Sequence, residues 1–310
     1  MMLIKPKFWD NKIGFFSIIL FPLSLVFLMI IFIKKKVSKV YKFKIPIICV
    51  GNVYVGGTGK TPLSILVANE IKMLGKKPVI LRKFYESHKD EYELIKNNLN
   101  NLIVNKKRID GIIEAEESNY DIAILDDGLQ DYKIKKDLNI VCFNEKQLIG
   151  NGLVMPAGPL RESLNILKST DIVIINGNKN KSFEEKILNI NDKLKILYSN
   201  YKPVNIEKFK KKKLFAFAGI GNPENFFQLM ENNGLFIKKR FIYPDHYEFS
   251  KNEIMNIVNE AKEENSQIIT TEKDYYKIRK FDIDKIQYIK IELNIEDRGV
   301  LIEKIKRLYD

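Results

Sequence analysis

Residues 44–74 read KIPIICVGNVYVGGTGKTPLSILVANEIKML, and this stretch decides the fold. The apolar run 44–50 is typical of a strand that is buried on both faces, and 62–77 has the apolar spacing of an amphipathic helix. Between them lies the glycine-rich sequence VGNVYVGGTGKTP, residues 50–62. A strand, a glycine-rich turn and a helix in this order predict a phosphate-binding loop.

The loop carries the groups that a bound phosphate needs. Its glycines allow backbone N–H groups to approach phosphate oxygens closely, Lys60 can reach the terminal phosphates, and the Thr61 hydroxyl can ligate Mg²⁺. Tyr54 stands where the strict GxxxxGK[ST] pattern has its first glycine. A bland surface loop does not explain the sequence GGTGKT, so we predict nucleotide binding by Val55, Gly56, Gly57, Thr58, Gly59, Lys60 and Thr61.

A nucleotide site of this type also needs an acid at the end of a neighbouring strand to hold Mg²⁺. The apolar run 122–125 is followed by Asp126 and Asp127, which meet that need. Strand ends often carry solvated acids, so the pair alone is a weak signal. Together with the glycine loop, it predicts a metal site formed with Thr61.

Four further apolar runs resemble the strand at 44–50, namely PVILR (78–82), IAILDD (122–127), NIVCF (139–143) and DIVIIN (171–176). Because helical segments separate the strands, we expect an α/β fold: a P-loop NTPase-like parallel sheet with helices on both faces. A second, smaller α/β domain begins after the basic run 208–213. We therefore expect three parts: an N-terminal membrane anchor at 1–36, a P-loop kinase domain at 37–205 and a smaller C-terminal domain at 206–310.

Residues 15–33, FFSIILFPLSLVFLMIIFI, carry no charge. At 1.5 Å per residue they form about 28 Å of helix, close to the thickness of a bilayer core. A cleaved signal peptide is the alternative, but three lysines follow the segment where a small-residue cleavage site would stand. We expect an N-terminal membrane helix with the remaining chain on the cytoplasmic side; Pro22 leaves open whether it spans or dips into one leaflet.

The net charge of +13 is unevenly distributed. Residues 1–44 contain nine lysines and one acid, for a net +8, and most of this excess flanks the apolar segment. That pattern fits membrane lipids with anionic headgroups and not nucleic acid, for which no recognition motif is present. The two cysteines, Cys49 and Cys142, lie in apolar runs and are expected to be reduced core residues.

The order of five motifs resembles the tetraacyldisaccharide 4′-kinase family of lipid A biosynthesis. These are VGNVYVGGTGKTP, LDDGLQ (125–130), GNGLVMPAGPLRE (150–162), YPDHYEFS (243–250) and TEKD (271–274). The resemblance implies ATP-dependent phosphorylation of the 4′-hydroxyl of an acylated glucosamine disaccharide 1-phosphate, with ATP and Mg²⁺ as cofactors. It also implies a location at the bacterial inner membrane, with the catalytic domains on the cytoplasmic face, and we expect a monomer.

The resemblance assigns roles to single residues. Lys60 corresponds to the family's phosphate-binding lysine, and Thr61, Asp126, Asp127 and Glu162 to its magnesium site, with Arg161 as a basic catalytic neighbour. Considered alone, Arg161 and Glu162 would be interpreted as an exposed pair at the start of a helix. A proton acceptor for the sugar hydroxyl is implied at Asp90, paired with His246, and the active site is expected between the two domains.

The chain departs from the family pattern at three places. Asp131 replaces the histidine that usually follows DDG(L/F)Q, which puts a negative charge near the proposed metal site. The glycines of the segment after the second strand are absent from LRKFY (81–85), and Lys89 stands where glycine usually precedes the family aspartate. These departures weaken the assignment of Asp90 more than that of Lys60.

Two other classes of function remain open from sequence alone. One is a membrane-attached P-loop ATPase that uses ATP hydrolysis to switch the binding of a partner. It would explain the glycine loop, the aspartate pair and the anchor, but it assigns no role to the motifs PAGPLRE and PDH. A non-catalytic nucleotide sensor is disfavoured by the retained Lys60, Asp126 and Asp127. Dependence of ATP turnover on an acylated disaccharide phosphate distinguishes these functions from a lipid kinase.

Overall fold

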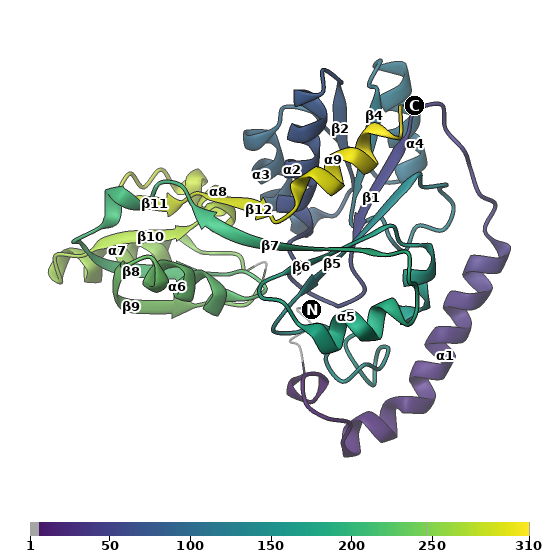
Figure 1. The fold of residues 1–310 in the computed structure, drawn as a ribbon. Coiled ribbons are helices and arrows are strands. Elements are labelled where there is room, and N and C mark those ends of the chain that lie inside the picture. The colour runs from purple at the N-terminus through teal and green to yellow at the C-terminus, as the bar shows by residue number, and fades with distance from the viewer. Residues whose placement is uncertain (1–5, 246, 310) are drawn as a thin grey trace. The chain divides into compact units, whose positions relative to one another are not determined.

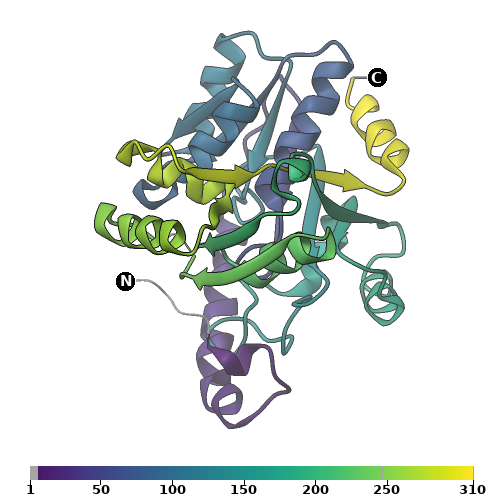
Figure 2. The same ribbon diagram turned by 90° about the vertical axis from the view of Figure 1, so that its left-hand side faces the viewer.

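The computed structural model describes residues 6–245 and 247–309. The chain forms two compact units, both drawn in Figures 1 and 2. Unit 1 comprises Met1–Phe84, Asn101–Asn200 and Ile295–Asp310, and unit 2 comprises Tyr85–Asn100 and Tyr201–Asn294. Each unit has its own sheet and its own buried core.

Unit 1 is organised around a sheet whose eight strands lie in the order β12-β7-β6-β5-β1-β4-β2-β3. The boundaries between the units fall within two of these strands, so the end of β7 and most of β12 are counted with unit 2. Each neighbouring pair from β7 across to β3 is parallel, as the sequence predicts. The strands are β1 (Ile47–Gly51), β2 (Pro78–Lys83), β3 (Leu102–Asn105), β4 (Ile122–Asp126), β5 (Leu138–Asn144), β6 (Ile172–Asn176), β7 (Lys195–Pro203) and β12 (Ile291–Ile295).

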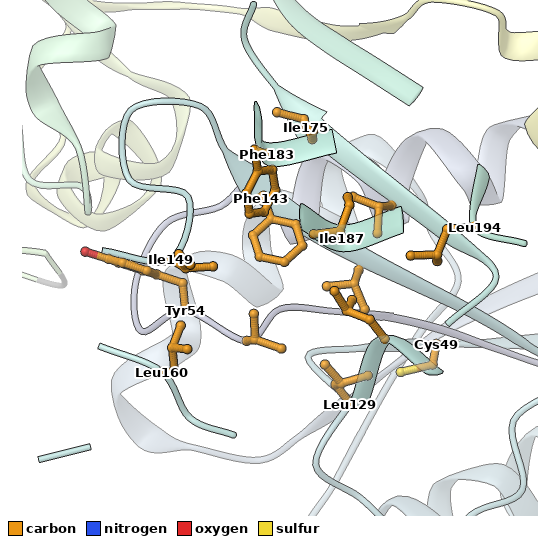
Figure 3. Close-up of a cluster of buried hydrophobic side chains, with 14 of the residues drawn as sticks. Cys49, Tyr54, Leu129, Phe143, Ile149, Leu160, Ile175, Phe183, Ile187 and Leu194 are labelled. Atoms are coloured by element: carbon orange, nitrogen blue, oxygen red, sulfur yellow. The ribbon is translucent and has the colours of Figure 1, made fainter. Parts of the chain in front are cut away.

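Helices cover both faces of this sheet. On one face, Ile47 packs in a cluster with α4 (Arg108–Glu117), and Cys49 packs in the cluster of Figure 3, which includes α5 (Lys181–Leu188). Because side chains alternate along a strand, Ile48 and Val50 point to the other face, and both are fully buried there. That face is covered by α2 (Lys60–Met73), which contacts β1, β2 and β4.

Unit 2 has a four-stranded parallel sheet in the order β11-β10-β8-β9. Alternate residues of the central strand β8 (Lys213–Ala218) pack against α6 (Pro223–Asn232) on one face and α7 (Lys251–Glu263) on the other. The remaining elements are α3 (Lys89–Asn98), β9 (Phe236–Ile242), β10 (Gln267–Thr271), α8 (Glu272–Ile278) and β11 (Ile286–Ile289).

The division of the chain differs from the expected ranges 37–205 and 206–310 at two segments. Residues 85–100 belong to unit 2, because α3 packs against α8 and its Asp90 pairs with lysines of that helix. Residues 295–310 belong to unit 1, because α9 (Arg298–Lys306) buries Leu301 and Ile305 completely and Arg298 pairs with Glu70 of α2. Composition along the chain gives no signal for either assignment.

Helix α1 (Phe15–Val37) is 23 residues long and continues through Pro22. It is the one helix among the described residues that is long and apolar enough to cross a membrane, with a mean hydropathy of 2.9. Most of its large apolar side chains are exposed, whereas Ser17 and Ser24 are buried. These serines follow one line along the helix, at a spacing of seven residues.

The pairing of α9 with α2 leads to a testable stability difference. Glu70 is 3% exposed, so Arg298→Ala leaves a buried carboxylate without its cation and should lower the free energy of unfolding by about 2 kcal/mol or more. Arg307→Ala is the matched control, because its pair with Glu303 is exposed and worth about 0–1 kcal/mol. Urea unfolding measures both, and equal losses would contradict the role of α9 in unit 1.

Candidate active site

The glycine-rich loop of unit 1 joins β1 to α2 with a left-handed backbone at two glycines. Gly56 has φ 120° and Gly59 has φ 89°, values that L side chains rarely adopt. Gly59 is the N-cap of α2, so the unpaired N–H groups of the first helical turn face the loop. This geometry presents backbone donors and the positive end of the helix dipole to an anion.

Thr58 provides a second sign of a ligand in this loop. Its side chain is 2% exposed, and its Oγ1 has no hydrogen-bond partner among the described residues. Buried hydroxyl groups are normally satisfied, so an unsatisfied one within a glycine loop indicates a partner that binds there. Phosphate oxygens are such partners.

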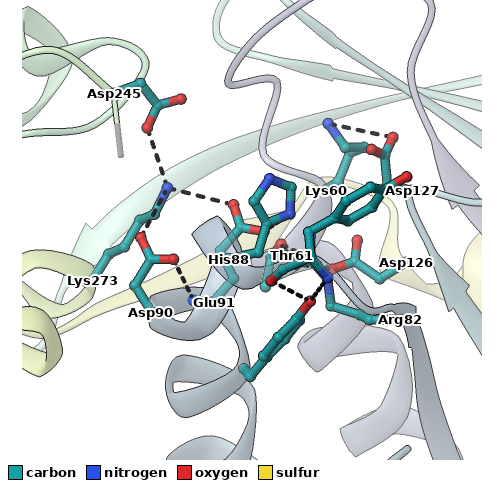
Figure 4. A network of polar contacts seen from close by, with 12 residues as sticks. Lys60, Thr61, Arg82, His88, Asp90, Glu91, Asp126, Asp127, Asp245 and Lys273 are labelled. Atoms are coloured by element: carbon teal, nitrogen blue, oxygen red, sulfur yellow. Dashed lines mark hydrogen bonds and ion pairs between the residues drawn. The ribbon is translucent and has the colours of Figure 1, made fainter. Parts of the chain in front are cut away.

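The side chain of Asp126, at the end of β4, is fixed by three donors. The Thr61 hydroxyl and Arg82 Nη1 each donate to Oδ2 at 2.9 Å (Figure 4). Ser64 Oγ donates to Oδ1 at 3.3 Å. Arg82 also donates to Thr61 Oγ1 at 3.1 Å. The cation compensates the burial of Asp126, which is 1% exposed.

Thr61 and Asp126 fit Mg²⁺ by the chemistry of their oxygen atoms. Mg²⁺ in phosphate-transfer sites takes one or two protein carboxylates together with substrate phosphates and several waters. Two adjacent oxygen donors at the end of a glycine loop are therefore sufficient. Among residues 6–245 and 247–309, no group of three or more His, Cys, Asp or Glu side chains could hold a metal ion by itself.

Asp127 has a different environment from Asp126. Its backbone is left-handed at φ 59°, Arg161 Nη1 donates to its Oδ1 at 2.7 Å, and Lys60 Nζ lies 3.8 Å from the same oxygen. Burial opposes its ionisation, but Lys60, Arg161 and Arg108 outweigh burial and hold the pKa of Asp127 well below its usual range. The phosphate-loop lysine and Arg161 thus share one carboxylate.

Arg108 fixes the backbone of the aspartate pair. Its Nη2 donates to the carbonyl oxygens of Asp127, at 2.7 Å, and Asp126, at 3.3 Å. Its Nη1 lies 3.8 Å from Asp131 Oδ2. The negative charge that replaces the usual histidine is therefore balanced by Arg108.

Glu162 is fully buried, and its hydrogen-bond partners differ from those expected of a metal ligand. Oε1 accepts from Lys35 of α1, and Oε2 accepts from the Tyr132 hydroxyl at 3.0 Å. The adjacent residue, Arg161, forms the ion pair with Asp127. The interpretation of Arg161 and Glu162 as an exposed pair at a helix start is wrong, since both are at least partly buried in a non-helical segment.

Asp90 lies in unit 2, near the start of α3, and is 6% exposed. Its Oδ1 accepts from the Glu91 amide at 2.9 Å, and Nζ of both Lys273 and Lys277 lies 3.5 Å from Oδ2. Lys273 also pairs with Asp245 at 3.2 Å (Figure 4). His246, the residue paired with Asp90 by family resemblance, lies outside the described residues.

The charge of Lys273 is maintained by these acids. Burial lowers its pKa, but Glu91, Asp245 and Asp90 outweigh burial and raise the pKa of Lys273 above its ordinary value. A permanent cation beside Asp90 favours the ionised carboxylate, the form that can accept a proton.

Sequence reasoning gave no role to Arg82, Lys273 or Lys277. Arg82 had a detectable signal, because it is the one charged residue of the strand PVILR and stands at its carboxyl end. Lys273 lies in the TEKD motif and Lys277 lies three residues after it, and the motif by itself indicates no role for either lysine. Their role depends on α3 packing against α8, which only the structure shows.

Comparison with known proteins gives matches along nearly the whole chain. A family model described as tetraacyldisaccharide-1-P 4′-kinase matches residues 16–310. A protein of Pelagibacter ubique named tetraacyldisaccharide 4′-kinase is 43% identical, over 100% of this chain and 99% of the relative. A protein of the same name from Rickettsia bellii is 35% identical, over 98% of each.

A solved structure shares the fold. It is described as LpxK from Aquifex aeolicus in complex with ATP, and it aligns with a TM-score of 0.74 at 24% identity. The alignment covers 96% of this chain and all of the other. The expected α/β architecture is confirmed by this likeness and by the parallel sheets described above.

The lowered pKa of Asp127 predicts a dependence of stability on pH. Because the folded value lies below the unfolded one, the ionised carboxylate stabilises the folded protein above about pH 4, and this contribution is lost as the pH falls further. Asp127→Asn should therefore lower the urea midpoint at pH 7, and its difference from the unsubstituted protein should narrow progressively as the pH falls below about 4. Asp110→Asn, exposed on α4, is the matched control, and a pH-independent loss in Asp127→Asn would contradict the prediction.

Proposed function

The chain belongs to the tetraacyldisaccharide-1-phosphate 4′-kinase family, and we propose that it transfers the γ-phosphoryl group of ATP to the 4′-hydroxyl of an acylated glucosamine disaccharide 1-phosphate. The product is the bis-phosphorylated lipid IVA of lipid A biosynthesis. The observation that carries the proposal is the glycine loop with Lys60 and Thr61 beside Asp126, in a chain that the family matches over residues 16–310.

In this proposal unit 1 binds the nucleotide. Backbone N–H groups of residues 56–61 hold the phosphates, whereas the Val55 amide donates to the Pro159 carbonyl. Lys60 neutralises the negative charge on the group in transfer. Thr61 and Asp126 would hold Mg²⁺, which would supply positive charge to neutralise the phosphates. Asp127 keeps Lys60 and Arg161 close together before the nucleotide binds, and the adjacent Glu162 is bound by Lys35 and Tyr132.

The acceptor hydroxyl must lose a proton as it attacks the phosphorus atom. We assign Asp90 as the group that accepts this proton, with His246 as its partner. The support is that Asp90 is buried yet accompanied by two lysines, which keeps its carboxylate ionised and available.

The lipid substrate explains why the enzyme carries α1. The exposed apolar side chains of α1 match the acyl region of a membrane, and the lysines at its end match anionic headgroups. Its buried serines pack on segment 151–157 of unit 1, so one side of the helix stays on the protein along much of its length. We place the enzyme at the cytoplasmic face of the bacterial inner membrane, as a monomer whose site residues all come from one chain.

Lys60→Ala tests the phosphate site. Removing the charge that stabilises the transferring group should lower lipid phosphorylation by roughly 10²- to 10³-fold, while circular dichroism shows an unchanged fold. Lys72→Ala, exposed on the same helix, should stay within about twofold of the unsubstituted enzyme. Near-normal transfer in folded Lys60→Ala would reject the assignment.

Asp90→Asn and His246→Ala test the proton acceptor. Each should lower transfer by roughly 10²- to 10⁴-fold while ATP affinity is retained, because neither residue belongs to the phosphate loop. The double variant should be little worse than the worse single one, since residues that act as a unit are not additive. Glu93→Gln, exposed on α3, controls for disturbance of the helix, and multiplicative losses would refute the pair.

A switch ATPase is distinguished from this kinase by its acceptor. With purified enzyme, ³²P from γ-labelled ATP should appear in the disaccharide lipid, and ATP consumption should stop when the lipid is omitted. ATP hydrolysis to inorganic phosphate at an undiminished rate without lipid would contradict the proposed function and support a switch.

A further inference from the structure

Tyr54 is the last fully buried residue before the phosphate loop begins. Its ring is 0% exposed and packs in a core cluster with Ile149 and Leu160 (Figure 3). By contrast, residues 55–57, 59 and 60 of the loop are at least partly open to solvent. Its position therefore fixes where the loop starts. This is the position at which the strict loop pattern has glycine.

The hydroxyl of this buried tyrosine is bound by a distant part of the chain. It donates to Asp10 Oδ1 at 2.7 Å, across 44 positions of sequence. Burial, together with the Asp10 carboxylate, raises the pKa of Tyr54, so the hydroxyl keeps its proton and remains a donor. Asp10 follows the short 3-10 helix Lys7–Trp9 and precedes α1.

The segment that carries Asp10 is itself fixed to unit 1. Trp9 is 7% exposed, its Nε1 donates to the Pro156 carbonyl at 3.0 Å, and its own carbonyl accepts from the Asn151 amide at 2.8 Å. Gly150 permits this approach, because a Cβ atom there would lie 2.5 Å from the Trp9 carbonyl oxygen. Asp10 is thus presented to Tyr54 by a rigid backbone.

The same region holds the backbone of the loop stem. The Val55 amide donates to the Pro159 carbonyl at 3.0 Å, the Arg161 amide donates to the Val53 carbonyl at 2.7 Å, and Asn52 Nδ2 donates to the Tyr54 carbonyl at 2.6 Å. Residues on either side of Tyr54 are therefore fixed by segment 159–161, and its side chain is fixed by Asp10.

We propose that Tyr54 is a positioning residue for the nucleotide, and that Asp10 holds it so that the N–H groups of the phosphate loop are aligned before ATP binds. This inference deepens the proposed function, because it concerns the ATP site of that kinase. The segment before α1 is then part of the nucleotide site as well as part of the membrane attachment. Neither the glycine pattern nor the anchor predicts this link.

The test measures affinity for a non-hydrolysable ATP analogue with Mg²⁺, using the full chain in detergent. Tyr54→Phe keeps the ring and removes the donor, and Asp10→Ala removes the acceptor; each should weaken binding by roughly 3- to 30-fold. The double variant should bind no more weakly than the weaker single variant, because both lose the same hydrogen bond. Asp10→Asn retains an acceptor oxygen and should restore most of the affinity.

Two controls separate positioning from general destabilisation. Tyr198→Phe removes another buried hydroxyl of unit 1, bound to Glu184, and should lower thermal stability without changing affinity for the analogue. In turnover assays Tyr54→Phe should raise the KM for ATP and leave the KM for the lipid unchanged. Unchanged analogue affinity in folded Tyr54→Phe and Asp10→Ala, or an equal loss in Tyr198→Phe, would overturn the inference. If the unsubstituted protein does not phosphorylate the lipid, the proposed function is rejected. The affinities for the ATP analogue would still test whether Tyr54 and Asp10 position the phosphate loop.

Discussion

The hydrogen bond between the Thr61 hydroxyl and the Asp126 carboxylate is the interaction on which the nucleotide site of unit 1 depends. It joins the first turn of α2 to the end of β4, and strand register makes it possible, because Val50 of β1 lies opposite Asp126 in the parallel ladder. The pairing of β2 with β4 brings Arg82 to the same edge. Three parallel strands thus deliver the loop, the acid and its counter-ion to one point.

Charge balance at this edge explains how the chain tolerates its departures from the family pattern. An aspartate in place of histidine at position 131 would be costly beside two further carboxylates if no cation were near. Arg108 faces Asp131 with one end of its guanidinium group and holds the carbonyls of the aspartate pair with the other. One rigid cation therefore serves both, which a lysine could not do with the same geometry.

The elements that follow from local pattern were predictable, and the contacts between distant segments were not. The strand at 47–51, the glycine loop and α2 follow from apolar spacing and glycine position, and the acid at the end of β4 follows from parallel topology. By contrast, the assignment of α3 to unit 2 rests on its packing against α8. Asn98 of α3 donates a hydrogen bond to Glu272 of α8, although 174 positions of sequence separate the two residues. Ser24 shows the same limit, because a lone serine in an apolar helix gives no sign of the carbonyl it binds.

The discontinuous course of the chain also sets an order of assembly during synthesis. Part of unit 1 precedes unit 2 along the chain, yet α9, which pairs with α2 through Arg298 and Glu70, follows all of unit 2. The buried Glu70 carboxylate therefore has no cation from α9 until residue 298 has been synthesised. The packing of unit 1 can be completed only after every residue of unit 2 has been made.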